Sequence, residues 1–145
     1  MIATEGLVAH CVFGDRTLGQ VTHRGLATVI TATDLRTGNA MRFGSLNSSC
    51  SAYGVITAPV TVAEAVAASA AFLLLLPAME RTYTFTRPGA AASSQHVLLL
   101  TDGGIYDNLG LSVLEPGRSA SHTAHVYDVD YIIACDAAAG ESFCP

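Results

Sequence analysis

Three short runs of apolar residues predict buried strands: 26–33 (LATVITAT), 97–101 (VLLLT) and 131–135 (YIIAC). None of them alternates polar with apolar residues, and such runs are typical of parallel strands that are covered on both faces. An aspartate follows each run, namely Asp34, Asp102 and Asp136. Because the carboxyl ends of parallel strands meet at one edge, where ligands bind, we expect three carboxylates there. The alternative is that each aspartate caps a turn or a helix start.

One helix is expected over about 61–76, between Pro59 and Pro77. Thr61 and Glu64 have the spacing of a capping box, in which Thr61 accepts the Glu64 amide and Glu64 reaches back. The helix is apolar almost all round, so it is buried or lies against lipid, and its small residues favour packing on a sheet. The uncharged stretch 65–79 is shorter than the 18 or so residues of a transmembrane span.

Length and composition indicate a single domain over 1–145, since the chain has 145 residues and half of them are hydrophobic. This apolar fraction excludes a disordered tail, and the low charged fraction of 13% excludes a coiled coil. Seven basic residues against twelve acidic ones give a net charge of −5. This balance excludes the basic stripe of a nucleic-acid binder and gives no attraction to anionic membranes. The chain starts without a signal-peptide pattern, which favours a cytoplasmic or membrane-peripheral location.

No metal or cofactor is expected. The four cysteines (Cys11, Cys50, Cys135 and Cys144) have no C-x-x-C spacing, so we interpret them as buried or incidental thiols. The aspartates offer oxygen ligands for Mg²⁺ or Ca²⁺, but no EF-hand spacing supports a site. A dinucleotide-binding fingerprint and a phosphate-binding P-loop are both absent from the sequence.

The strongest candidate for chemistry is Asp102, because Gly103 and Gly104 follow it directly. Glycines permit positive φ and leave room beside the carboxylate for another backbone or a ligand. An aspartate in such a place can act as general base toward a hydroxyl, or hold a histidine in its tautomer.

Four segments in order give this motif a context: 33–43 (TDLRTGNAMRF), 64–77 (EAVAASAAFLLLLP), 102–110 (DGGIYDNLG) and 131–137 (YIIACDA). Together, over about 20–140, they resemble the C-terminal part of a patatin-like phospholipase domain. The resemblance implies an α/β fold, a partial three-layer α/β/α arrangement with a mainly parallel central sheet. It also implies a serine–aspartate dyad that hydrolyses lipid acyl esters through an acyl-enzyme without a metal. In that family pattern Asp102 is the dyad aspartate, Gly103 and Gly104 shape its turn, and Asp107 and Asn108 order the following loop or helix start.

The nucleophile of that pattern is missing, since the sequence contains no Gly-x-Ser-x-Gly. The segments 117–121 and 140–144 come nearest, but both lack the second glycine and both follow Asp102. We therefore expect an incomplete domain that is inactive alone, that associates with a missing N-terminal half, and that contacts lipid substrate or a membrane periphery when intact. Other serines and histidines are assigned to packing or loops: Ser69, Ser45, Ser48, Ser49, Ser51, His96, His122 and His125.

Two further interpretations stay open. The first is a non-catalytic pseudoenzyme or interaction fragment that binds a partner through an exposed sheet edge and an apolar helix. The second is a small flavodoxin-like ligand-binding domain.

Overall fold

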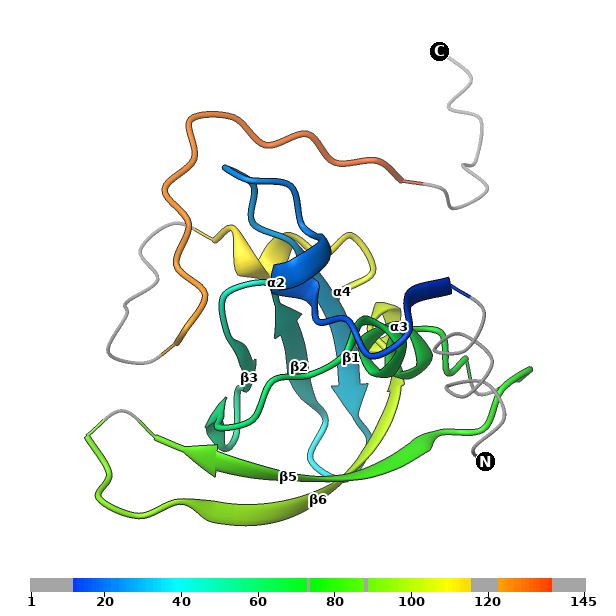
Figure 1. Ribbon diagram of the computed structural model, residues 1–145. Helices are drawn as coiled ribbons and strands as arrows, with labels where there is room; N and C mark the ends of the chain where they lie inside the picture. Colours follow the sequence, from blue (N-terminus) through cyan, green and yellow to red (C-terminus); the bar gives the residue numbers. More distant parts are fainter. Residues whose placement is uncertain (1–11, 73, 88, 116–122, 137–145) are drawn as a thin grey trace.

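Short turns join most of the strands of this protein, so each strand pairs with the strand before it in an antiparallel manner. The computed structural model describes residues 12–72, 74–87, 89–115 and 123–136. In them, six strands form a closed antiparallel barrel (Figure 1). The strands are β1 (Val29–Asp34), β2 (Asn39–Gly44), β3 (Ser48–Cys50), β4 (Gly54–Ile56), β5 (Met79–Thr86) and β6 (Ser94–Asp102). The helices are α2 (Leu18–Val21), α3 (Val62–Ser69), α4 (Gly104–Asp107) and the 3-10 helix η2 (Leu111–Val113).

The barrel contradicts the predicted α/β/α fold with a parallel sheet. Residues 35–38 alone connect β1 to β2, and so short a connection can join only antiparallel strands. The turn closes with the Gly38 amide donating to the Asp34 carbonyl at 2.8 Å and with Gly38 at φ +68°. At the other edge of β1, β6 pairs antiparallel, with Ala32 opposite Asp102, and completes the barrel. The continuous apolar runs have a different cause from the one expected: α3 packs on β1 and β6, and α4 packs on β1 and β2.

The core fills the barrel and the interface between the barrel and α3. Its largest fully buried apolar side chains are Phe43, Phe85, Met41, Leu98 and Leu100. The small buried residues of α3 complete the cluster with Ala65, Ala67 and Ala68. The prediction that this helix packs closely on the sheet is therefore confirmed.

Helix α3 starts as predicted and ends earlier. The Thr61 hydroxyl accepts the Glu64 amide at 3.2 Å, as the capping box requires. The Glu64 carboxylate does not reach back; it accepts the Tyr83 hydroxyl at 2.8 Å, and burial, followed by this carboxylate, raises the pKa of Tyr83. The helix ends at Ser69 because the Ala71 carbonyl accepts bonds from the Thr101 hydroxyl (2.6 Å) and the Asp102 amide (3.2 Å). These bonds tie the chain to the end of β6.

Two of the three predicted strands exist, as β1 and β6, with shifted bounds. The third, 131–135, is wrong: its residues form no strand and are exposed, with Tyr131 91% and Ile133 90% accessible. In Figure 1 this segment arches away from the barrel. Among the described residues no helix is long and apolar enough to cross a bilayer. The segment 116–124, which its Gly, Ser and His residues predict to be an exposed loop, lies mostly outside the described residues.

Candidate functional site

Asp102 is the last residue of β6, and its backbone is fixed from two sides. Its amide donates to the Ala71 carbonyl beyond α3, and its carbonyl accepts the Thr33 hydroxyl of β1 at 3.0 Å. The side chain is half-buried, and its Oδ1 accepts the Gly104 amide at 2.9 Å. The other carboxylate oxygen has no hydrogen-bond partner among the described residues. The fold thus presents one oriented and one available oxygen at the end of a rigid strand.

The two glycines allow neighbouring atoms to approach the backbone closely, and neither of them is needed for a positive φ. Gly103 has φ −63° and ψ −27°, and neither glycine has a positive φ, so that part of the expectation is wrong. A Cβ on Gly103 would lie 2.6 Å from the Thr31 carbonyl oxygen and closer still to the Thr31 hydroxyl. A Cβ on Gly104 would lie 3.0 Å from the Asn108 amide oxygen and 3.4 Å from the Asp102 carboxylate. Small residues therefore let β1, the carboxylate and α4 meet.

Asp107 ties the end of α4 to η2. Its Oδ2 accepts the Ser112 amide at 2.7 Å. Burial acts to raise the pKa of Asp107, but hydrogen bonds from Ser112, Leu111 and Gly110 outweigh it and hold this pKa below its usual value. Asn108 follows α4 as its exposed C-cap.

This shift predicts an acid-sensitive link between α4 and η2. Because the folded pKa of Asp107 lies below the unfolded one, its stabilisation is complete above the unfolded pKa, about 4, and is lost as pH falls through the folded value. Urea unfolding between pH 6 and pH 3 should therefore show wild type losing more stability than Asp107→Asn, by an amount that solvent screening keeps small. Parallel stability curves for the two proteins would contradict this assignment.

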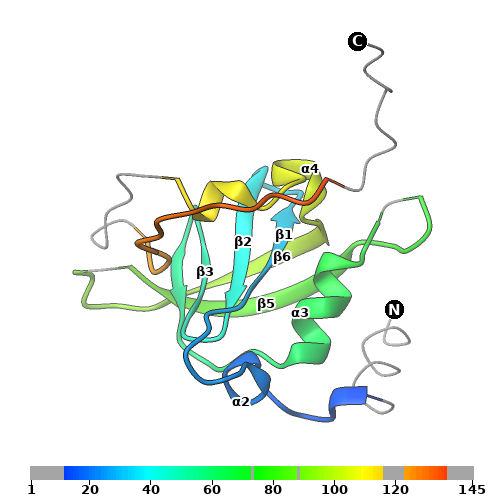
Figure 2. The same cartoon turned by 90° about the horizontal axis from the view of Figure 1, so that it is seen from above.

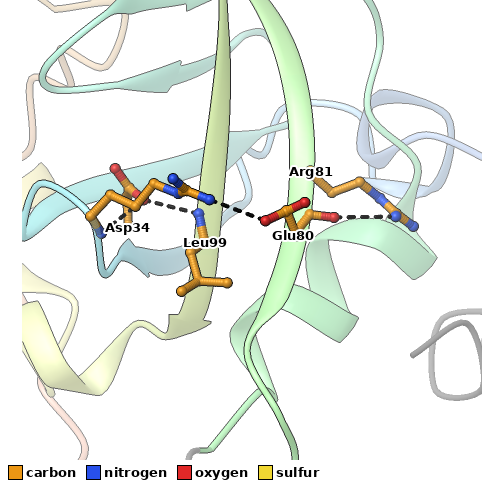
Figure 3. A network of polar contacts seen from close by, with 5 residues as sticks. Asp34, Glu80, Arg81 and Leu99 are labelled. Atoms are coloured by element: carbon orange, nitrogen blue, oxygen red, sulfur yellow. Dashed lines mark hydrogen bonds and ion pairs between the residues drawn. The ribbon is translucent and has the colours of Figure 1, made fainter.

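The three strand-end carboxylates do not gather at one edge. In the antiparallel pairing of β1 with β6, Asp34 lies opposite Leu100, two positions along the ladder from Asp102, while Asp136 is exposed and outside any strand. Asp34 is fully buried and accepts bonds from the Leu99 amide (3.1 Å), the Thr37 hydroxyl (2.7 Å) and the Arg36 amide (3.3 Å). Figure 3 shows this side chain between the turn and β6, beside the exposed Arg36–Glu80 ion pair. Asp34 therefore belongs to the turn, which is the capping alternative.

Metal ligands and thiols add no site within the described residues. No group of three or more His, Cys, Asp or Glu side chains there could hold a metal ion. Cys50 is buried, and burial raises its pKa, whereas Cys135 is exposed.

No serine or histidine among the described residues bonds to the Asp102 carboxylate. His125, expected in an exposed loop, is buried, with its Nδ1 3.2 Å from the Tyr127 hydroxyl; His122 lies outside the described residues. His96 bonds locally to Ser94 at 2.9 Å and stacks on Tyr53. The serine–aspartate pair is thus not assembled from the described part of the chain.

Sequence analysis missed two features near the site. Arg42 is buried and donates to the hydroxyls of Ser51 (2.8 Å) and Ser112 (3.3 Å), which links β2 to η2. An apolar pocket of about 340 Å³ lies against the start of β1, and its lining residues are Ala27, Val29, Val113, Leu114, Tyr127 and Val129. Both features arise only where η2 contacts strands that are distant in the sequence, so no local sequence pattern predicts them.

A second pocket, of about 260 Å³, lies between α2 and the loops that follow β2 and β4. Its polar lining comes from small hydroxyl and amide side chains such as Thr17, Ser45 and Asn47. Asp102 is not part of either lining. Comparison of the chain with protein-family models, with curated proteins and with solved structures finds no match.

Proposed function

We propose that this protein supplies the aspartate of a serine–aspartate site that hydrolyses lipid acyl esters, the activity that the patatin-like resemblance implies. The observation that supports it is the Asp102 carboxylate, with one oxygen held by the Gly104 amide and the other without a partner in the described residues. The barrel differs from the α/β/α fold that the resemblance implies, so the proposal rests on the motif and its geometry alone.

In this proposal Asp102 acts as general base. The carboxylate takes the proton of a serine hydroxyl as the serine oxygen attacks the ester carbonyl, and it returns this proton to the departing alcohol as the acyl-enzyme forms. Water, deprotonated by the same carboxylate, then cleaves the acyl-enzyme, which releases the fatty acid, and the proton returns to the serine. The serine and the oxyanion donors come from outside the described residues. The apolar pocket of about 340 Å³ at the start of β1 has the size and lining to receive an acyl chain, and Asp102 lies further along β1, opposite Ala32.

The chain by itself should not hydrolyse a chromogenic short-chain ester. A carboxylate without a nucleophile and preorganised oxyanion donors lacks the groups that supply most of the acceleration, and losing one donor alone costs on the order of 10²–10³ in turnover. The measurement is p-nitrophenyl butyrate hydrolysis by the purified chain. Turnover that disappears in Asp102→Ala would show that the chain holds a complete site.

The positive test starts from the coding region upstream of the Met1 codon. A glycine-rich loop and a Gly-x-Ser-x-Gly in frame are expected, and the extended product should hydrolyse phospholipid or glyceride esters. Asp102→Asn in that product should lower kcat by about 10²–10⁴, whereas Asp128→Asn, a substitution of an exposed aspartate, should not. An extended product without the serine, or one indifferent to Asp102→Asn, overturns the proposal.

A second candidate function is that of an interaction fragment, and the segment 131–133 favours it. Tyr131, Ile132 and Ile133 are exposed and unpaired with any strand in the described residues, although their side chains suit a sheet. Such a segment can add to the sheet of a partner. Sizing at micromolar concentration should then show association that Ile133→Lys abolishes, and a monomeric wild type would contradict it.

A further inference from the structure

The described residues of the loop between α3 and β5, 70–72 and 74–78, expose two leucines to solvent. Leu74 and Leu75 are 84% and 83% accessible, and Phe72 is 44% accessible. These values are high for apolar side chains that stand side by side in the chain, and adjacent exposed apolar residues mark interaction sites. We call residues 70–72 and 74–78 the apolar loop.

The shape of the apolar loop suits a fluid partner better than a folded one. The Leu75 and Leu76 amides both donate to the Phe72 carbonyl, at 2.9 and 2.8 Å, and form one tight turn. Leu74 and Leu75 stand on the outside of this turn, and Figure 2 shows the loop projecting from the barrel beyond α3. A protruding turn with separately exposed leucines offers no groove in which a folded partner could dock. Lipid hydrocarbon, in contrast, can surround each side chain.

The charges around the apolar loop indicate which lipid surface fits. Residues 65–79 contain no charged side chain. The acids at the two ends are engaged in the protein, since Glu64 accepts the Tyr83 hydroxyl and Glu80 pairs with Arg36. The net charge of −5 and the absence of basic residues in the loop disfavour an anionic surface. A zwitterionic phospholipid bilayer is the surface that this chemistry fits.

The apolar loop is also tied to Asp102. The Ala71 carbonyl, one residue before Phe72, accepts the Asp102 amide at 3.2 Å and the Thr101 hydroxyl at 2.6 Å. An inserted loop would therefore hold the end of β6 close to the membrane surface. This gives the lipid ester of the proposed function a route to the carboxylate, but membrane binding itself does not depend on that function.

We propose that the apolar loop inserts Phe72, Leu74 and Leu75 into the hydrocarbon of a zwitterionic bilayer. The interaction is hydrophobic and carries no requirement for anionic lipid or low salt. Hydrolysis could fail while insertion succeeds, or the reverse, so the two proposals are tested separately.

The chain contains no tryptophan, so a single introduced tryptophan reports on one position. Leu75→Trp places the reporter in the apolar loop. Leu46→Trp is the matched control, because Leu46 is 78% exposed in the loop between β2 and β3. With phosphatidylcholine vesicles, Leu75→Trp emission should shift to the blue and be quenched by brominated lipid. Leu46→Trp emission should stay unchanged.

Vesicle flotation gives a second measurement on a chain without the reporter. The double variant Leu74→Ser/Leu75→Ser should bind phosphatidylcholine vesicles about tenfold or more weakly per leucine, while Leu46→Ser binds as wild type. Both positions are exposed, so the fold should survive, which circular dichroism checks. Adding phosphatidylserine or salt should not strengthen binding.

Three results would overturn the proposal. The first is Leu75→Trp emission that vesicles leave unchanged. The second is an equal blue shift at Leu46→Trp, which would mean adsorption of the whole molecule. The third is a dimer in solution that Leu74→Ser/Leu75→Ser converts to monomer, which would assign the loop to a second copy of the chain.

Discussion

Gly103→Ala is expected to destabilise the protein by about 2–3 kcal/mol, because the added methyl group meets backbone that cannot move away. At Gly103 the new Cβ would lie 2.6 Å from the Thr31 carbonyl oxygen and 2.8 Å from the carbonyl carbon. Thr31 pairs with Arg42 of β2 on one side, and on the other side Gly103 directly follows the β6 residues that pair with Ala32–Asp34, so relief requires the end of β6 to move away from β1. The backbone conformation of Gly103 is right-handed and open to alanine, so the whole effect comes from this contact. Urea unfolding measures it.

Gly104→Ala is the matched control, one residue further along. Its Cβ would meet only side-chain atoms, the Asn108 amide oxygen at 3.0 Å and the Asp102 carboxylate at 3.4 and 3.6 Å, and these can rotate away. Within a helix, alanine also makes the free energy of folding more favourable than glycine does, by up to about 1 kcal/mol. We expect Gly104→Ala to be close to neutral. Equal stability of the two variants would mean that β1 does not press on Gly103.

The elements that could be predicted from the sequence are those with a local cause. Thr61 and Glu64 predict the start of α3, and the run 97–101 lies within β6. The direction in which neighbouring strands pair has no such local cause. The run before Asp34 has the composition of a parallel strand, but the turn at 35–38 places β2 beside it in antiparallel register. The weakly patterned strands β3 and β4, three residues each, depend on their neighbours for pairing and could not be predicted.

In the candidate site, too, the features with a local cause could be predicted and those that depend on the closed barrel could not. Asp102 with two glycines is visible in the sequence, and close approach at Gly103 follows from it. The reason for the approach is Thr31, about seventy residues earlier in the chain, and only the closed barrel brings β1 against this turn. The run 131–135 is the opposite case: its β-branched residues are typical of a strand, yet it pairs with none of the strands in the described residues. Propensity without a pairing partner does not make a strand.

Asp34→Ala should cost about 3 kcal/mol, the other large effect expected for this protein. The Asp34 carboxylate is fully buried and accepts the Leu99 amide (Figure 3), and it also accepts the Thr37 hydroxyl and the Arg36 amide. Truncation leaves the Leu99 amide inside the protein without an acceptor, which alone costs about 1–3 kcal/mol, and removes both bonds that shape the turn. Urea unfolding and amide hydrogen exchange at Leu99 measure the loss.

Two variants separate this role from a simple loss of charge. Asp34→Asn keeps an oxygen acceptor of the same size, so it should retain most of the stability and most of the protection of the Leu99 amide. Glu80→Ala removes the acid of the exposed Arg36–Glu80 pair, which is worth less than about 1 kcal/mol. If Asp34→Ala unfolded at the same urea concentration as Glu80→Ala, the carboxylate would not hold the turn against β6. A carboxylate that strongly stabilises the turn is already committed to three donors, and this is the physical reason to place the chemistry at Asp102 instead.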